Sequence, residues 1–307
     1  MSGRMRIVLL LSMSTAAGCA TWFRAQEDLG PAAGEPAQIF AVGVVSTGDV
    51  FASTFTPDGR TVAFTKFSPP HPMTLMTSSF RDGHWTTPET LPFSGSYRDL
   101  DPAFSPDGTR LYFSSARPTG PSPADTTNGV DTWFVDRTRD GWSAPVHLAP
   151  PVNGPEVDMY PSVTSQGTLY FDSFRSRPRR RLVYRAEVNP DGTLAAPQAL
   201  PAIVNADSGA SNLFVDPAER YVVFSAIRPE GAGSGDLYVS FRRGGEWTPP
   251  RNIGPLVNTS ATEFCPFVSR DGTYLYFTRI TPAGPQSVVR NIYRVRFDQI
   301  LGGLQQQ

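Results

Sequence analysis

Cysteine, histidine and charge are scarce in this chain of 307 residues. It has two cysteines and three histidines, too few for a disulfide framework, and no histidine stands at the spacing of metal ligands. Charged residues make up 18% and the formal net charge is −1, so the chain lacks the basic field that gathers nucleic-acid phosphates. We therefore expect no histidine metal centre, no organic cofactor and no nucleic-acid partner.

Runs rich in glutamate, lysine and leucine, which form helices, are also few. The chain instead has 30 prolines, 27 glycines and frequent aromatic residues, so turn formers are in excess. This composition predicts an all-β protein. All-β folds of this length often form one domain, so the organisation has to be read from repeats.

The first 18 residues have the layout of a secretory signal. Arg4 and Arg6 precede the apolar residues 7–11, which are too few for the roughly 20 that a membrane span needs. The small residues that follow end at Cys19 and resemble the bacterial lipobox, in which this cysteine is acylated. The alternative is ordinary cleavage nearby, for instance after Ala20.

Lipidation of Cys19 would anchor the protein in the cell envelope, and the alanine that follows it favours the outer membrane. Residues 19–35 are rich in Ala, Gly, Pro and Glu and suit a tether between anchor and folded body. A lipidated Cys19 leaves Cys265 without a disulfide partner in the monomer. Cys265 lies in an apolar strand-like segment, where we expect it to be a small buried side chain.

A block of two alternating segments joined by a tight turn recurs five times. Its first copy is Ser53-Thr54-Phe55-Thr56-Pro57-Asp58-Gly59, which leads into Thr61-Val62-Ala63-Phe64-Thr65. The turn positions are 49, 59, 52 and 53 residues apart: Gly59, Gly108, Gly167, Glu219 and Gly272. Propeller repeats have roughly 40 to 50 residues, so each copy predicts one four-stranded blade with slightly extended loops.

The fifth repeat ends after three strands, near Phe297. Its missing outer strand is matched by Pro36-Ala37-Gln38-Ile39-Phe40, which resembles the outer strands of the other repeats, such as Pro145-Val146-His147-Leu148. The sequence therefore predicts a five-bladed β-propeller of four-stranded antiparallel blades over residues 36–300, with the N-terminal strand closing the last blade. Residues 301–307 are left as a C-terminal tail.

The Pro-Asp-Gly turn followed by Leu-Tyr-Phe-Ser, as in residues 106–114, resembles the WD40-like propeller repeat of the TolB family. The resemblance covers about residues 36–297. That repeat occurs in periplasmic accessory proteins, lipoproteins, cell-wall-associated proteins and the non-catalytic propeller of prolyl oligopeptidases. TolB itself has six blades and a further N-terminal domain, so the resemblance does not extend to partners such as Pal or a colicin.

Three acids lead into innermost strands at one repeat position: Asp99, Asp158 and Glu263, each three residues before a proline. Carboxylates from separate blades could act as the acid and nucleophile of a glycosidase or lyase. They could also hold a ligand or an ion such as calcium in the channel, or form hydrogen bonds at strand entry. Because the three acids are repeat-equivalent, duplication of a structural role is the favoured interpretation, a ligand or ion site the second, and catalysis the third.

We expect an exported, monomeric propeller that binds an envelope protein or a small ligand and catalyses no reaction. A carbohydrate-active enzyme and an envelope scaffold are the alternatives. Residues 118–130 are the expected partner-contacting insertion, and the basic run of residues 175–181 is interpreted as a solvated hairpin tip. We further expect Arg117, Arg175 and Arg228 to pair within their blades with acids such as Asp131 and Asp236.

Overall fold

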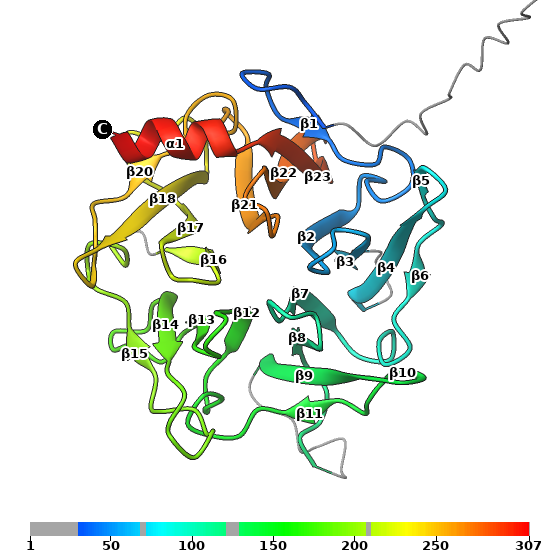
Figure 1. Ribbon diagram of the computed structural model, residues 1–307, viewed down its shortest axis with the longest axis vertical. Coiled ribbons are helices and arrows are strands. Elements are labelled where there is room, and N and C mark those ends of the chain that lie inside the picture. The colour runs from blue at the N-terminus through cyan, green and yellow to red at the C-terminus, as the bar shows by residue number, and fades with distance from the viewer. Residues whose placement is uncertain (1–29, 68–71, 121–128, 207–209, 307) are drawn as a thin grey trace, which may run out of the picture.

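The computed structural model describes residues 30–67, 72–120, 129–206 and 210–306. In this part of the chain, five antiparallel sheets surround a central axis and form a five-bladed β-propeller (Figure 1). The predicted fold class is confirmed. Cys19 with its signal, His71 and the middle of the 118–130 insertion lie outside the described residues.

Each of the first four blades runs outward from an innermost strand at the axis. Blade 1 contains β2 (Val50–Phe55), β3 (Thr61–Lys66), β4 (Thr74–Arg81), β5 (His84–Trp85) and β6 (Glu89–Thr90). Blade 2 contains β7 (Asp99–Phe104), β8 (Arg110–Ser115), β9 (Asp131–Thr138), β10 (Gly141–Trp142) and β11 (Val146–His147). Blade 3 contains β12 (Asp158–Val163), β13 (Leu169–Ser173), β14 (Leu182–Ala186) and β15 (Gln198–Ala199). Blade 4 contains β16 (Ser211–Val215), β17 (Tyr221–Ala226), β18 (Asp236–Arg243), β19 (Glu246–Trp247) and β20 (Arg251–Asn252).

Blade 5 joins the two ends of the described chain. It contains β21 (Thr262–Val268), β22 (Tyr274–Gly284), β23 (Ser287–Arg296) and, as its outer strand, β1 (Gln38–Ile39). Directly after β1, the Phe40 N–H donates to the Ile292 carbonyl at 2.9 Å. The Phe40 ring is buried against Phe55, Trp85 and Tyr276, with centroid distances of 5.5, 5.2 and 5.2 Å. The predicted closure is confirmed, and it pairs what would otherwise be an open sheet edge.

The repeated turns join the first and second strand of every blade at one end of the ring, which we call the turn face. Their key residue has a positive φ, between 69° and 85° at four glycines and 55° at Glu219. The turn aspartate is also used locally, since Asp58 accepts hydrogen bonds from the Thr56 hydroxyl at 2.6 Å and the Arg60 N–H at 3.0 Å. Glycine and aspartate therefore stand where the backbone requires them.

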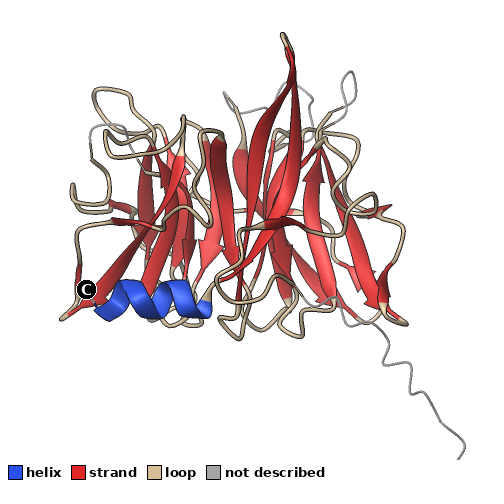
Figure 2. Cartoon of the chain, turned by 90° about the horizontal axis from the view of Figure 1, so that it is seen from above, coloured by secondary structure: helices blue, strands red, loops and turns tan. Residues whose placement is uncertain are grey.

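Residues 298–306 form a helix, α1 (Asp298–Gln306), which covers most of the segment assigned to the tail. Ile300, Leu301 and Leu304 pack on the apolar cluster between blades 4 and 5. Arg243 and Arg251 donate to the carbonyls of Gln305 and Leu304, each at 2.8 Å. Figure 2 shows the helix at one end of the ring, opposite the projecting β22–β23 hairpin. Within the described residues, no helix has the length and apolar character needed to span a membrane.

Candidate functional site

The three acids singled out in the sequence are fully buried, and each forms an ion pair inside its own blade. Asp99 accepts hydrogen bonds from Arg117 at 2.8 Å, Ser115 at 2.6 Å and Ser94 at 2.8 Å. The structure does not bring the three acids together, because each of them lies at the start of the innermost strand of a different blade and pairs within that blade.

Asp158 and Glu263 repeat this arrangement. Asp158 accepts from Arg175 at 2.6 Å, and Glu263 accepts from Arg279 at 2.7 Å and from the Thr259 hydroxyl at 2.7 Å. Burial raises the pKa of Asp158 above its ordinary value, although the hydrogen bond from Ser173 and the charge of Arg175 oppose this. All three acids thus have the contacts of structural strand-entry residues, and an ion or ligand at them remains a prediction.

Arg117 and Arg175 form ion pairs within their blades as expected, but with acids other than Asp131 and Asp236. Arg117 binds Asp99, whereas Asp131 accepts from the His147 ring at 2.6 Å. In blade 4, the position that corresponds to Asp99 is Ala210, and among the described residues Arg228 donates to the Val204 carbonyl oxygen. The partner of each arginine depends on the residue that opens the innermost strand.

The innermost strand of every blade contains a β-bulge at the same position. In the three blades that have one of these acids, the bulge residue follows the acid by two residues. The bulge residue has a φ of 50° to 55° in all five blades, although none of the five is glycine. These residues are Ala52, Asp101, Tyr160, Asn212 and Cys265. A bulge breaks the alternation of a strand and re-aims a side chain. Because the innermost strands surround the axis, their bulge residues meet there, and those of blades 1, 3 and 5 pack in one buried cluster.

Neighbouring blades are tied together at the bulges. Four bulge N–H groups donate to a side-chain oxygen on the second strand of the preceding blade, at 2.9 to 3.1 Å. The acceptors are Thr278, Thr65, Ser114 and Asp172. At the remaining interface, the Ser225 hydroxyl donates to the Glu263 carbonyl at 2.9 Å. Four of these five second-strand residues are Ser or Thr, and Asp172 is the exception.

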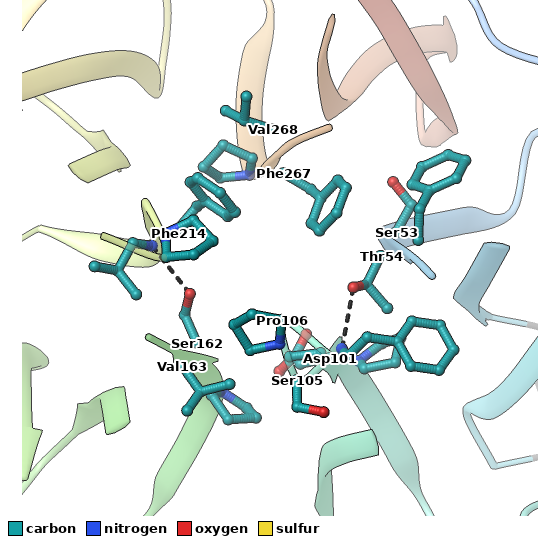
Figure 3. Close-up of a pocket in the computed structure, with 18 of the residues that line it drawn as sticks. Ser53, Thr54, Asp101, Ser105, Pro106, Ser162, Val163, Phe214, Phe267 and Val268 are labelled. Atoms are coloured by element: carbon teal, nitrogen blue, oxygen red, sulfur yellow. Dashed lines mark hydrogen bonds between the residues drawn. The ribbon is translucent and has the colours of Figure 1, made fainter. Parts of the chain in front are cut away.

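The five innermost strands enclose a cavity at the turn face (Figure 3). It has about 660 Å³ of free space, including the part that opens to solvent. Its walls are largely apolar. The lining residues come from every blade: 53–55 and 57, 101–106, 160–163, 213–215 and 217, and 266–268 and 270. None of the three predicted acids lines it.

Two bulge residues, Asp101 and Tyr160, line the inner part of this cavity. Asp101 is 3% exposed and accepts one long hydrogen bond, from the Ser114 hydroxyl at 3.4 Å. Burial raises the pKa of Asp101 to about 7, with the charge of Arg181 opposing the rise and that of Asp172 adding to it. The Tyr160 hydroxyl donates to the Pro266 carbonyl at 3.4 Å.

A buried ion pair and a thiol lie next to these two residues. Asp172 accepts from Arg181, whose Nε is 3.0 Å away, and burial raises the Asp172 pKa. Cys265 is 1% exposed, as expected, and burial raises its pKa well above the ordinary value. A buried thiol with a raised pKa is not a reactive nucleophile. The basic run therefore has two parts: Arg177 and Arg179 are exposed as predicted, while Arg181 reaches Asp172.

The arrangement is suited to binding. An apolar cavity with a few polar groups and a carboxyl of perturbed pKa is the usual form of a ligand site. A glycosidase needs two carboxyl groups on either side of the scissile bond. Asp101 is the one acid among the described residues that line the cavity. In the same part of the chain, no group of three or more His, Cys, Asp or Glu side chains is placed to hold a metal ion.

Asp101, Tyr160 and Asp172 are not among the residues predicted from the sequence, and Arg181 was predicted only as part of a solvated basic run. The bulge position carries a different residue type in every repeat, so no local pattern marks Asp101 or Tyr160. Asp172 does stand out, as a carboxylate where the other repeats have a hydroxyl. Positive φ is normally expected at glycine, and none of the five bulge residues is glycine.

No protein-family model matches the sequence, and no curated protein matches it. Among solved structures, the catalytic domain of Coprinopsis cinerea GH62 alpha-L-arabinofuranosidase aligns with a TM-score of 0.53 and 14% identity, over 86% of this chain and 95% of that one. A putative TolB from Agrobacterium tumefaciens aligns with a TM-score of 0.50 and 14% identity, over 79% and 76%.

TolB from Acinetobacter baumannii aligns with a TM-score of 0.49 and 16% identity over 81% of this chain. This chain covers only 55% of that protein's length. At such identities the likeness shows the fold alone. The comparisons therefore show that the protein has the β-propeller fold, which a putative TolB and a glycosidase share.

Proposed function

We propose that this protein is an exported propeller of the cell envelope that binds a small ligand in the turn-face cavity and catalyses no reaction. The cavity with Asp101 at its inner part carries the proposal. Its walls are held rigidly, because the Phe104 N–H donates to Thr54 at 3.1 Å and the Val215 N–H donates to Ser162 at 3.0 Å, each across a blade boundary. Such preorganisation reduces the entropy that binding must overcome.

Export and anchoring through Cys19 rest on the sequence of the first 19 residues. The TolB-like architecture is compatible with an envelope location. A carbohydrate-active enzyme is less well supported, because the predicted acids are neutralised by arginines and the cavity offers a single carboxyl group.

The test is to purify the tagged protein from its native envelope and to identify copurifying molecules and the mature N-terminus by mass spectrometry. Ala103 lines the cavity and is partly exposed. We expect Ala103→Trp to lose a small molecule that the wild type carries. Ala199→Trp, the matched control on outer strand β15, should retain it.

Equal ligand content in wild type and Ala103→Trp would contradict the proposed cavity. Release of sugar from arabinoxylan oligosaccharides by the wild type, abolished in Asp101→Asn or in variants of Asp99, Asp158 or Glu263, would instead establish the enzyme alternative. An acylated Cys19 in the mature protein would support the anchor, and an N-terminus beyond residue 19 would exclude it.

A further inference from the structure

We propose that the turn-face cavity selects a ligand with a primary ammonium group on an apolar body, and that Asp101 accepts the hydrogen bonds of this ammonium group. The inference rests on the proposed function and names the chemical class of the ligand. It follows from which hydrogen-bonding groups the cavity wall offers and which it lacks.

The inner wall has few free N–H donors, although the hydroxyl groups of Ser53, Thr54 and Ser162 line it and the exposed Arg270 lines the cavity as well. Six of its residues are prolines, which have no N–H group: Pro57, Pro102, Pro106, Pro161, Pro217 and Pro266. The N–H groups of Phe104 and Val215 are used between blades, and the Tyr160 hydroxyl donates to a carbonyl. A ligand that presents only acceptors could bind these hydroxyl groups or Arg270, but it would leave the buried Asp101 carboxyl group without a donor beyond Ser114.

Asp101 is an acceptor with unused capacity. A carboxylate has about four lone-pair sites, and Asp101 accepts one hydrogen bond, at 3.4 Å. Arg181 does not neutralise it by direct contact, because its Nε and Nη2 both donate to Asp172. A buried carboxylate with so few partners is costly unless a charged donor reaches it.

The remaining walls suit the body of such a ligand. Phe55, Phe104, Phe214 and Phe267 line the cavity from four blades, and Figure 3 shows Phe214 and Phe267 beside it. Aromatic rings bury apolar area and also attract cations through their faces. A ligand of this class would place its ammonium group at Asp101 and its apolar body among the phenylalanine rings.

Phenethylamine and phenethyl alcohol provide the decisive comparison, since they share an aromatic body and differ in the charged group. In calorimetric titrations of the mature protein near neutral pH, we expect phenethylamine to bind at least about tenfold more tightly, the gain of a charge-assisted hydrogen bond. Asp101→Asn should abolish this preference. Asp136→Asn, which removes an exposed carboxylate on β9, should preserve it.

The preference should also grow from about pH 6 to pH 8, because Asp101 ionises in this range while the amine stays protonated. The dipeptide Phe-Ala presents a primary ammonium group at a peptide terminus, and because the pKa of this group is only about 8 the two amines are compared near pH 7. Whichever of the two amines binds more tightly identifies a free amine or a peptide as the source, and either result supports the proposed chemistry.

Equal or tighter binding of the alcohol, a preference that survives in Asp101→Asn, or no binding of either amine at millimolar concentration would overturn the inference. The comparison of amine and alcohol uses the wild-type protein, so it does not depend on the folding of a variant. Ligand loss in Ala103→Trp together with no preference for an amine would leave the cavity as a binding site and reject only the ligand class.

Discussion

Asp99 and Asp101 stand two residues apart on β7 and have opposite surroundings. Asp99 is buried with an arginine and two hydroxyl groups, so its charge is fully compensated. Asp101 is buried almost as deeply and has one long hydrogen bond. The bulge at Asp101 separates the two environments. We therefore assign a structural role to the first and ligand contact to the second.

The buried ion pairs should contribute strongly to stability. Arg117→Ala leaves Asp99 charged and 0% exposed, and removing one partner of a buried pair typically costs about 3 to 5 kcal/mol. The exposed pair of Lys66 and Asp49, 3.2 Å apart, is the control, and Lys66→Ala should cost less than about 1 kcal/mol. Urea unfolding of both variants measures the difference, and similar losses would contradict this account.

Asp101 should make stability depend on pH. Its pKa is about 7 in the folded protein and near 3.8 when unfolded, so the folded state binds the proton more tightly. The associated stability is present below about pH 4 and is lost as the pH rises through about 7. The side chain of Asp101→Asn stays neutral at every pH. The free energy of unfolding of this variant should therefore increase relative to that of the wild type as the pH rises through this range, by on the order of a few kcal/mol at pH 8.

Urea unfolding of both proteins at about pH 5 and pH 8 checks this expectation. The free energy of unfolding of the variant should exceed that of the wild type by more at pH 8 than at pH 5. A constant difference between the two proteins would show that Asp101 ionises normally in the folded state.

Among the elements, the turns and the closing strand could be predicted and the bulges could not. Pro-Asp-Gly sets the backbone angles of a hairpin locally, so the turn is encoded where it forms. The match between residues 36–40 and the outer strands likewise predicted β1. The bulges depend on hydroxyl groups from the preceding blade, such as Thr65 and Ser114, which no local pattern reveals. Helix α1 was missed because its apolar residues are few and need blades 4 and 5 to pack on.

Closure by β1 should depend on Phe40 more than on the strand's own side chains. Phe40 is 1% exposed among three aromatic rings, and Phe→Ala in a core costs about 3 to 5 kcal/mol. Ile39 is 36% exposed, so Ile39→Ala should cost about 1 kcal/mol or less. Thermal and urea unfolding of the two variants test this. A larger loss of stability in Ile39→Ala than in Phe40→Ala would show that closure depends on strand β1 and its pairing with β23, and not on the packing of Phe40.

At the scale of the whole molecule, side chains from several blades are buried together at the axis. Phe51 and Phe264 stack at a centroid distance of 6.3 Å in the cluster that also holds Tyr160 and Cys265. Of these four side chains, Tyr160 lines the turn-face cavity and the other three do not. The repeat spacing predicted the number of blades. It did not predict which side chains meet at the axis, because these come from five strands that are far apart in the sequence.

Cys265 should report whether the ring opens as a unit. Its thiol is 1% exposed at a bulge that packs against residues of other blades, so a thiol reagent needs the blades to separate. In a Cys19→Ser variant, we expect labelling by dithionitrobenzoate to be negligible in the native protein and to rise with urea in parallel with tryptophan fluorescence. Fraying of β1 alone should leave the thiol protected. Labelling that precedes the fluorescence transition would show that blades separate locally before the ring unfolds, and the axis would then be too mobile to preorganise a ligand site.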